Sequence, residues 1–535
     1  MISIYPATAF SHYPISYAYW PDGSRWTMSV AGLPTAFSYT YDAAGRQTGL
    51  TNPFSEASSW QYLNNSWLWK QTLANGAVTA YTYNARGFIT DQQTQNGGTL
   101  LSDFGGQTYN GVGDRTKVTA NLPVAPAVYS GTTSYGYDQG QTGNPALNRS
   151  QLTQETSTRS GGYNNVLGYD GGISTGPGNP TTFRGTSRTF NADNQDTANT
   201  YDGNGNPTTY NGSSLQFDPE NRMTQFGSAV TNTYTGDGLR AKKTVSSGAG
   251  SVWFVYDSDQ PICEMDSGGN LTAINTWGAN GLVSRRTSGT TLFYNFDPSG
   301  NGSLLLDGNA NVVASSVSDG FGNTFTTVTG DPYFGFGGQW GYYQDAQDGL
   351  NLLGHRFYDS STQRFLTRDP IGYRGGINLY AYTANNPVNN TDATGLFPVL
   401  TEPAPPPGII PILEAGGGTG LGTVLLTMGG VVGGVLGIAG PAGPVNEFPI
   451  TDPRNSQRIK DHNAYKRICN ESPPSGLNRC QLLLWTIERD EKCIAAKKAW
   501  DAKYEPGRHD TDTASRQRGV DRRKAEYSRL CCGQS

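Results

Sequence analysis

A short loop near the C-terminus carries three neighbouring residues that could do chemistry together, Arg508, His509 and Asp510. A histidine can serve as a general base near neutral pH, and a guanidinium group can hold the oxygens of a phosphate. Together with His462 or Lys466, which precede them in the same segment, they form the candidate site of a nuclease. Two structural interpretations remain open. Asp510 can be the N-terminal cap of a helix, or the three residues can be polar only because the loop is exposed to solvent.

Five of the six cysteines lie near the C-terminus, and this density indicates an oxidising destination. The five are Cys469, Cys480, Cys493, Cys531 and Cys532. If one helix runs from Cys480 to Cys493, its ends lie ~20 Å apart, whereas a disulfide needs Cα atoms within ~7 Å. These two then cannot pair with each other, and we expect bridges to Cys469 and to the Cys531/Cys532 end. A zinc site is the alternative, but the segment has no Cys-x-x-Cys or His-x-x-x-His spacing, so no metal site is predicted.

Helices are the elements that must position these residues. Apolar residues at helical spacing predict one helix over residues 482–500, and a second, basic helix is predicted over residues 513–532 with Asp512 or Thr513 as its cap. Residues 447–535 carry 18 Lys and Arg against 13 Asp and Glu, a net charge of +5. This charge suits an anionic target such as nucleic acid or lipid, but a solvated helical surface is the commoner cause of such a charge. No cofactor is predicted.

The longer N-terminal part has the composition of a β-protein. The chain contains 70 Gly, 30 Tyr and 30 Pro among 535 residues, with 15% charged residues, which favours short strands joined by tight turns. Alternating aromatic and polar residues end in Tyr-Asp-x-x-Gly, most clearly over residues 37–46. Asp or Asn at the first turn position and Gly at the fourth suit a type I turn, so each copy predicts one hairpin. Looser copies begin at Tyr81, Tyr135, Tyr201, Phe217, Tyr234 and Phe296.

Stacked hairpins predict an elongated, spiralling sheet, because a hairpin that cannot bury its face alone gains by stacking on its neighbours. Alternation places the aromatic residues on one face of that sheet, where cross-strand pairs stabilise it. We therefore expect the tyrosines to be structural. A platform for binding sugars is the alternative.

A second motif lies between residues 354 and 396. It consists of Gly-His-Arg-Phe-Tyr-Asp over residues 354–359, Gln-Arg-Phe-Leu-Thr-Arg-Asp-Pro over residues 363–370 and Asp-Ala-Thr-Gly-Leu over residues 392–396. With the repeats, it closely resembles the core signature of the Rhs/YD-repeat proteins, bacterial shells that enclose a variable C-terminal toxin. The resemblance implies a mainly β fold, a spiralling shell of YD-repeat hairpins forming a partial β-cocoon, with a small α-helical C-terminal domain. Its parts are the repeat shell (1–334), the core (335–396), a Pro- and Gly-rich linker (397–446) and a variable tip (447–535).

The resemblance also implies self-cleavage, because shells of this family cut their own chain just after the leucine of a core motif, with aspartates acting as in an aspartyl protease. The matching residues are Asp369 and Asp392, with Arg368 as a neighbouring charge, and the cut would follow Leu396. Such chemistry needs two carboxylates close together, one with a raised and one with a lowered pKa.

One departure from the family pattern bears on this expectation. Ala393 stands where the family usually has proline, a residue that would stiffen the turn presenting the scissile bond. Whether the chain still cuts itself is therefore open. Without the resemblance, Asp369 is a turn residue before proline and Asp392 a turn residue close to glycine.

The linker is unusually apolar, with no charged residue from position 415 to 446. Residues 421–442 would make ~33 Å of helix, against ~30 Å of hydrocarbon in a bilayer. Gly429, Gly433 and Gly437 follow the four-residue spacing that lets membrane helices approach closely. The segment is either a transient membrane insertion or a flexible linker. Since the first residues lack the basic and apolar regions of a secretory signal, we expect a secreted or cell-surface protein that uses another export route.

Together these patterns favour an Rhs-type polymorphic toxin, or a displaced 3′ fragment of one. Its shell would carry a C-terminal effector and release it by autoproteolysis in competition between bacteria. Expected partners are a cognate immunity protein, a component of a secretion apparatus, and a nucleic-acid or membrane target for the tip. The main alternative is a surface YD-repeat adhesin that binds glycans through exposed Tyr and Trp, and a purely structural shell is a third possibility.

Overall fold

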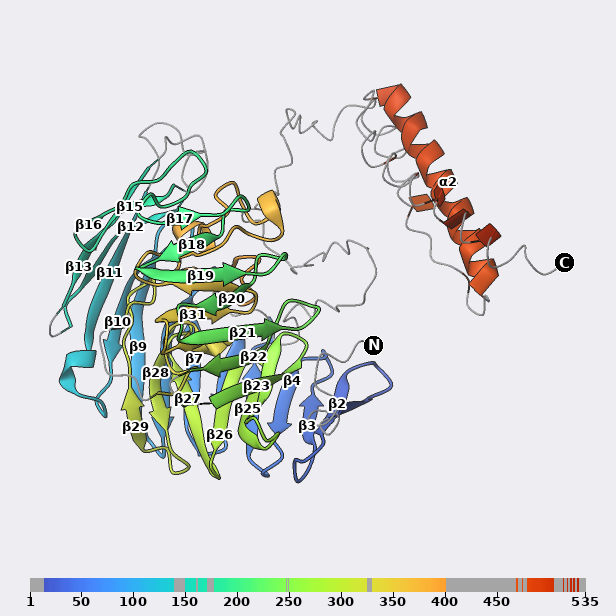
Figure 1. Ribbon diagram of the computed structural model, residues 1–535. Coiled ribbons are helices and arrows are strands. Elements are labelled where there is room, and N and C mark those ends of the chain that lie inside the picture. The colour runs from blue at the N-terminus through green and yellow to red at the C-terminus, as the bar shows by residue number, and fades with distance from the viewer. Residues whose placement is uncertain are drawn as a thin grey trace, which may run out of the picture. The chain divides into compact units, whose positions relative to one another are not determined.

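The computed structural model describes residues 14–138, 150–159, 162–170, 178–246, 248, 250–324, 330–400, 468–469, 474, 479–504 and single positions between 513 and 528. The chain divides into two units, Met1–Leu426 and Thr427–Ser535 (Figure 1). The first is built of strands and the second of helix, as the sequence predicts.

The first unit begins with a 13-stranded antiparallel sheet in which every strand pairs with the next along the chain. Its strands are β1 (Ile15–Tyr19), β2 (Arg25–Val30), β3 (Phe37–Tyr41), β4 (Gln47–Thr51), β5 (Ala57–Tyr62), β6 (Leu68–Thr72), β7 (Val78–Tyr83), β8 (Ile89–Asn96), β9 (Thr99–Tyr109), β10 (Arg115–Asn121), β11 (Gly131–Tyr137), β12 (Leu152–Ser157) and β13 (Asn164–Val166), with the 3₁₀ turn η1 (Ala127–Tyr129) before β11.

A small sheet leads into a second 13-stranded sheet with the same sequential order. The small sheet consists of β14 (Gly168–Tyr169), β15 (Pro180–Phe183) and β16 (Thr186–Ser187). The second large sheet consists of β17 (Thr200–Tyr201), β18 (Pro207–Tyr210), β19 (Ser213–Phe217), β20 (Met223–Phe226), β21 (Val230–Tyr234), β22 (Arg240–Val245), β23 (Gly250–Asp257), β24 (Gln260–Met265), β25 (Leu271–Gly278), β26 (Gly281–Thr287), β27 (Thr290–Phe296), β28 (Gly302–Leu306) and β29 (Val312–Ser315). Sequential pairing without closure is the stacked-hairpin arrangement that the repeats predict.

The repeat turn explains why each copy folds as a hairpin. In the copy between β3 and β4, the Asp42 carboxylate accepts the backbone N–H groups of Ala44 (2.9 Å) and Arg46 (3.0 Å). Gly45 donates its N–H to the Asp42 carbonyl at 3.0 Å and adopts a φ of +77°, a conformation that glycine takes without strain. The sequence pattern therefore encodes a type I turn followed by a left-handed glycine.

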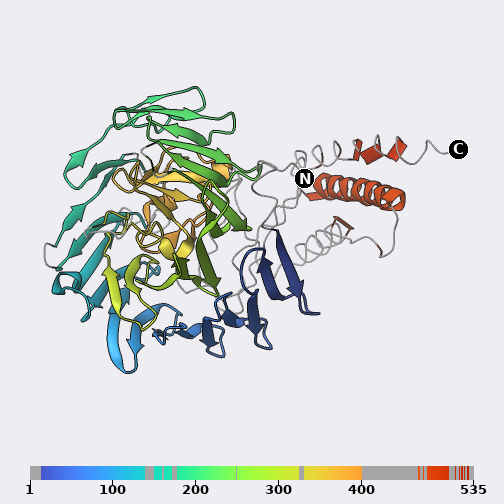
Figure 2. The ribbon, with the colours of Figure 1, turned by 60° about the horizontal axis from the view of Figure 1, so that its bottom comes forward.

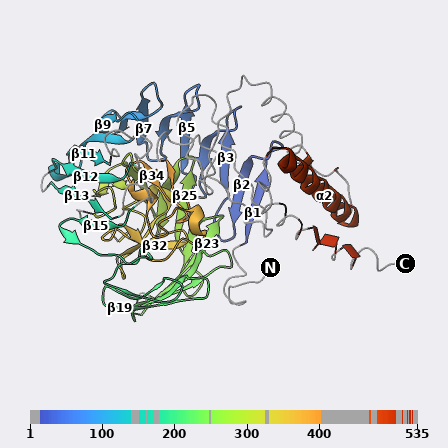
Figure 3. The same cartoon turned by 90° about the horizontal axis from the view of Figure 1, so that it is seen from above.

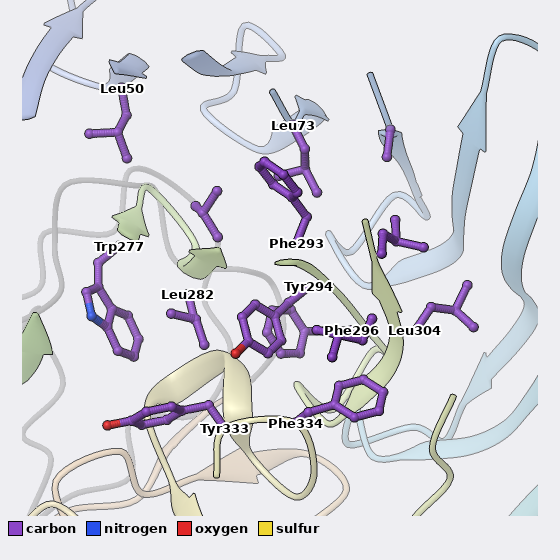
Figure 4. Packing of buried hydrophobic residues seen from close by; sticks show 14 of the residues in the cluster. Leu50, Leu73, Trp277, Leu282, Phe293, Tyr294, Phe296, Leu304, Tyr333 and Phe334 are labelled. Atoms are coloured by element: carbon purple, nitrogen blue, oxygen red, sulfur yellow. The ribbon is translucent and has the colours of Figure 1, made fainter. Parts of the chain in front are cut away.

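The inner faces of the two large sheets pack on each other (Figure 4). The Trp60 indole N–H donates to the Asn280 side chain at 2.9 Å, and the Gln92 amide donates to the Phe296 carbonyl at 2.7 Å. Repeat tyrosines such as Tyr39 belong to this core and are buried, which agrees with a structural use of these residues. Side chains of both sheets fill the space where they meet, together with Tyr333 and Phe334 from the segment that follows the second sheet.

The core segment lies between the two sheets (Figures 2 and 3). It contains η3 (Gly338–Trp340), β30 (Tyr343–Asp345), β31 (Leu350–Leu353), β32 (Arg356–Asp359), β33 (Arg364–Phe365), η4 (Gly372–Arg374), η5 (Thr383–Asn385) and β34 (Asn390–Thr391), and β35 (Val399–Leu400) follows it at the start of the linker. Buried aromatic residues join it to β11 and β15, and buried aliphatic residues join it to β19 and β20.

The second unit is organised by α2 (Arg479–Tyr504), which confirms the helix predicted over residues 482–500. The described positions between 513 and 528 are also helical. Cys469 forms a disulfide with Cys493, with Cα atoms 4.8 Å apart, and Cys480 is disulfide-bonded as well. The bridge from Cys469 to the helix is one of those that the helical spacing predicts. Cys531 and Cys532 lie outside the described residues.

One buried carboxylate links the helical elements of this unit. Asp490 on α2 is 3% exposed and forms ion pairs with Arg489 (2.9 Å) and with Arg523. Ile487 and Ile494 of the same helix pack against Val520. Among the described residues, none of the helices combines the length and apolar character needed to cross a membrane. The apolar stretch 421–442 lies outside those residues.

Candidate functional site

The candidate site lies where a hairpin loop of the core meets a tight turn. Strands β34 and β35 pair with each other, so residues 392–398 form the loop between them. The turn between β31 and β32 supports this loop, because the His355 N–H donates to the Thr394 carbonyl at 3.0 Å. Gly395 adopts a φ of +69°, and a Cβ there would lie 2.3 Å from the Leu353 carbonyl oxygen. Only glycine allows the loop to approach the turn this closely.

Asp392 holds the backbone on both sides of the Leu396 carbonyl carbon. The residue is 1% exposed, and one carboxylate oxygen accepts the N–H of Leu396 at 2.9 Å and that of Phe397 at 3.0 Å. The nitrogen of Phe397 belongs to the peptide bond at which the sequence predicts cleavage. The Asp392 N–H donates to the buried Tyr342 hydroxyl at 2.8 Å, which fixes the start of the loop.

Asp369 approaches the same peptide from another segment. Its backbone N–H donates to the Leu379 carbonyl at 3.0 Å, and its Oδ1 accepts the Ile371 N–H at 3.0 Å. A Cβ on Gly375 would lie 2.1 Å from Asp369 Oδ2 and 3.3 Å from the Leu396 carbonyl oxygen. Both oxygens therefore border the same small space.

Arg356 is the cation that joins the two carboxylates. Its Nη2 lies 2.9 Å from Asp369 Oδ2 and 3.4 Å from Asp392 Oδ2. Its Nε donates to the Gly395 carbonyl, and its Nη1 donates to the Leu379 carbonyl at 3.2 Å. The guanidinium carbon sits 3.5 Å from the centre of the Phe365 ring. One buried arginine thus holds both aspartates and the loop that carries the predicted cleavage bond.

Burial controls the protonation of this cluster. It raises the pKa of Asp369 to about 6, with Arg356 and the Ile371 N–H acting in the opposite direction and Asp392 adding to the rise. Burial also raises the pKa of Asp392, against the effect of Arg356 and of the loop N–H groups. The expectation of one raised and one lowered pKa is therefore not met, because desolvation outweighs the single shared cation at both positions.

The structure brings Asp369, Asp392 and Leu396 together and places Arg368 elsewhere. A Cβ on Gly205 would lie 2.5 Å from Arg368 Nε and 2.6 Å from the Tyr380 hydroxyl, so the Arg368 side chain points toward the repeat turn at Gly205. Sequence reasoning did not single out Arg356. Its signal was present, since Arg356 is part of the Gly-His-Arg-Phe-Tyr-Asp motif, but the motif gives no indication of which charged residue faces the aspartates.

The other predicted residues cannot be placed. Residues His462, Arg508, His509 and Asp510 lie outside the described part of the chain. Ala393 is described, and it lines a crevice together with Gly354 of the supporting turn, Trp277 and Tyr343. Position 393 therefore has space on one side.

Comparison with known proteins agrees with the fold and the core. No protein-family model matches the chain. The tRNA3(Ser)-specific nuclease WapA of Bacillus spizizenii is 30% identical over 171 residues, which are 31% of this chain and 7% of the relative. The double-stranded DNA deaminase toxin A of Burkholderia cenocepacia is 30% identical over 174 residues, 31% of this chain and 12% of the relative. The chain thus spans a small share of the length of these relatives.

A solved structure shares the fold. The crystal structure of TcdB2-TccC3-Cdc42 superposes with a TM-score of 0.58 at 18% identity, over 72% of this chain and 22% of that chain. At this identity the likeness concerns the fold alone. The hairpin repeats, the core segment and the similarity to these toxins together support an Rhs/YD-repeat protein with a polymorphic toxin core.

Proposed function

We propose that the core hydrolyses the peptide bond between Leu396 and Phe397, and so releases the C-terminal segment as a toxic effector in competition between bacteria. The observation that carries this proposal is the pair of hydrogen bonds from the Leu396 and Phe397 N–H groups to one oxygen of the buried Asp392. A carboxylate within 3.0 Å of the Phe397 nitrogen is within reach of the proton that the leaving amine must receive.

The geometry supports different roles for the two aspartates. In the proposed reaction the Asp392 carboxylate takes a proton from a water molecule, whose oxygen adds to the Leu396 carbonyl carbon. Protonated Asp369, beside the Leu396 carbonyl oxygen, gives its proton to the oxyanion that forms. The intermediate then collapses: the C–N bond breaks, the Phe397 nitrogen takes the proton held by Asp392, and Asp369 regains its own.

Arg356 supports both steps without exchanging protons. Its charge stabilises the ionised Asp392, and its hydrogen bond to the Gly395 carbonyl holds the loop against the aspartates. Burial of all three residues excludes bulk water, so the electrostatic interactions among them are stronger than they would be at the surface.

The assignment of Asp369 as the acid predicts a pH dependence. The active form needs Asp369 protonated, and its pKa is raised to about 6, so we expect the cleavage rate to fall about tenfold per pH unit above that value. On the acid side the rate should fall as Asp392 takes up a proton below its own raised pKa. The measurement is the rate of fragment formation after refolding from urea in buffers of different pH. A rate that rises with pH through about 6 would contradict the assignment, because Asp369 would then act as the base.

For the released segment we propose a nucleic-acid target. The two relatives named above act, by their names, on tRNA and on double-stranded DNA, and residues 447–535 carry a net charge of +5. The proposal implies the partners expected from sequence, an immunity protein and a component of a secretion apparatus. A pore formed with residues 421–442 is the competing activity of the same segment.

Expression of the full chain in a bacterial host separates these activities. We expect killing accompanied by degraded or modified nucleic acid at an unchanged membrane potential. If His509 is the general base, His509→Ala should lower the rate of nucleic-acid damage about 10²–10⁴-fold. The exposed Lys498 provides a matched control, because Lys498→Ala changes a surface charge of α2. Intact nucleic acid in dying cells with a collapsed potential would favour the pore. Growth without harm would contradict the toxin proposal and leave the adhesin.

A further inference from the structure

The backbone conformation at position 375 does not require a glycine. It follows η4 and has a φ of −79° and a ψ of −10°, the ordinary right-handed region that any residue can adopt. Its neighbour Gly376 differs, since its φ of +135° favours glycine. The reason for glycine at position 375 must therefore be space.

The space beside Gly375 is bordered by the two groups that react in the proposed cleavage, the Asp369 carboxyl group and the Leu396 carbonyl. A Cβ would lie 2.1 Å from Asp369 Oδ2, closer than two such atoms can approach, and 3.3 Å from the Leu396 carbonyl oxygen. A methyl group there would press against the carboxylate and would also be in tight contact with the carbonyl oxygen. Either the carboxylate or the loop would have to move.

Backbone contacts hold Gly375 in this position. Its N–H donates to the Gly372 carbonyl at 3.0 Å, which closes the turn that begins after Asp369. The Asp369 carbonyl accepts the Gly372 N–H at 2.9 Å, so the turn is tied directly to the aspartate. The large side chains of this turn face solvent, with Tyr373 79% and Ile377 59% exposed, and do not fix it by packing. The fit between turn and carboxylate is thus made by the backbone.

We propose that Gly375 is a positioning residue for self-cleavage, because the missing Cβ lets the Asp369 carboxyl group lie beside the Leu396 carbonyl. This inference rests on the proposed function. Gly375 touches no proton that is transferred and acts only through Asp369. Displacing a reacting group by about 1 Å typically costs on the order of 10²-fold in rate.

The first test is Gly375→Ala in the full chain. We expect cleavage after refolding to slow about 100-fold. The pH at which the rate declines should also shift down from about 6, since a carboxyl group pushed out of its buried position moves toward its ordinary pKa. Gly236→Ala is the matched control, because Gly236 lies outside the left-handed region and a Cβ there meets nothing within 4 Å. It should cleave at the wild-type rate.

A second test holds even where Gly375→Ala weakens folding. In a chain made uncleavable by Asp392→Asn, Gly375→Ala should lower the urea midpoint while Asp369 is present, and lower it much less once Asp369→Ala removes the carboxylate and leaves only the 3.3 Å contact with the Leu396 carbonyl oxygen. Equal loss in both backgrounds would overturn the proposal, as would slower cleavage with an unchanged pH profile. An uncut wild-type chain would instead defeat the proposed function, whereas a cut wild type with an equally fast Gly375→Ala variant would defeat only the role of Gly375.

Discussion

Replacing Asp392 with asparagine is expected to leave the chain uncut, or to slow its cleavage by at least about 10²–10⁴-fold. The side chains have the same shape, and the asparagine oxygen can still accept the N–H groups that now lie 2.9 and 3.0 Å from Asp392. What the amide cannot do is take a proton from water and return it to the Phe397 nitrogen. The loop should keep its conformation while the chemistry stops.

The measurement is the fraction of chain cut over time, read from the masses of the products. Asp266→Asn is a matched control: the Asp266 carboxylate also accepts two backbone N–H groups, those of Gly268 (2.8 Å) and Asn270 (2.9 Å), but in an exposed repeat turn away from the core. It should be cut at the wild-type rate. Cleavage of Asp392→Asn at the wild-type rate would remove Asp392 from the mechanism.

Replacing Arg356 with methionine is expected to lower the free energy of unfolding by about 3–5 kcal/mol, the usual cost of leaving a buried charge without its partner. Asp369 is 7% exposed and would keep no guanidinium group, and the carbonyls of Leu379 and Gly395 would lose a donor. The loss should grow as the pH rises from 5 to 8. Asp369, whose pKa is already raised to about 6, must then be either buried as an anion or kept protonated.

Urea unfolding in the uncleavable Asp392→Asn chain measures this effect on one covalent species. Arg374→Met is the control, since Arg374 is an exposed arginine of the neighbouring turn. It should change stability by less than about 0.5 kcal/mol. Equal effects of the two substitutions, or a loss at Arg356 that does not depend on pH, would show that Arg356 is not the counter-ion of Asp369.

The hairpin repeats could be predicted because their physics is local. Asp42 and Gly45 define a turn within a few residues of chain, and the alternation before them sets which side chains face the core. The helix α2 is predictable for the same reason. The sequence does not reveal how the two large sheets meet: contacts such as Trp60 with Asn280 join residues far apart in the chain, and nothing local marks them as partners.

The same distinction between local signals and contacts made by tertiary folding applies to the candidate site. Asp369 and Asp392 could be found because they stand in a recognisable motif, whereas the choice between Arg356 and Arg368 depends on tertiary folding. Arg368 is the nearer residue in sequence, but strand β32 turns Arg356 inward beneath the loop, where it contacts both carboxylates. The role of Gly375 could not be predicted for a similar reason. In sequence, a glycine that makes room for a neighbouring side chain cannot be told from an ordinary turn glycine.

The most direct test of the central claim is the mass and terminal sequence of the purified wild-type protein. Hydrolysis after Leu396 predicts two products, one of 396 residues ending in Leu396 and one of 139 residues beginning with Phe397, from the 535-residue chain. Both should be absent from the Asp392→Asn protein. A wild-type chain that stays intact at 535 residues after folding near pH 6, or one cut at another peptide bond, would contradict the account.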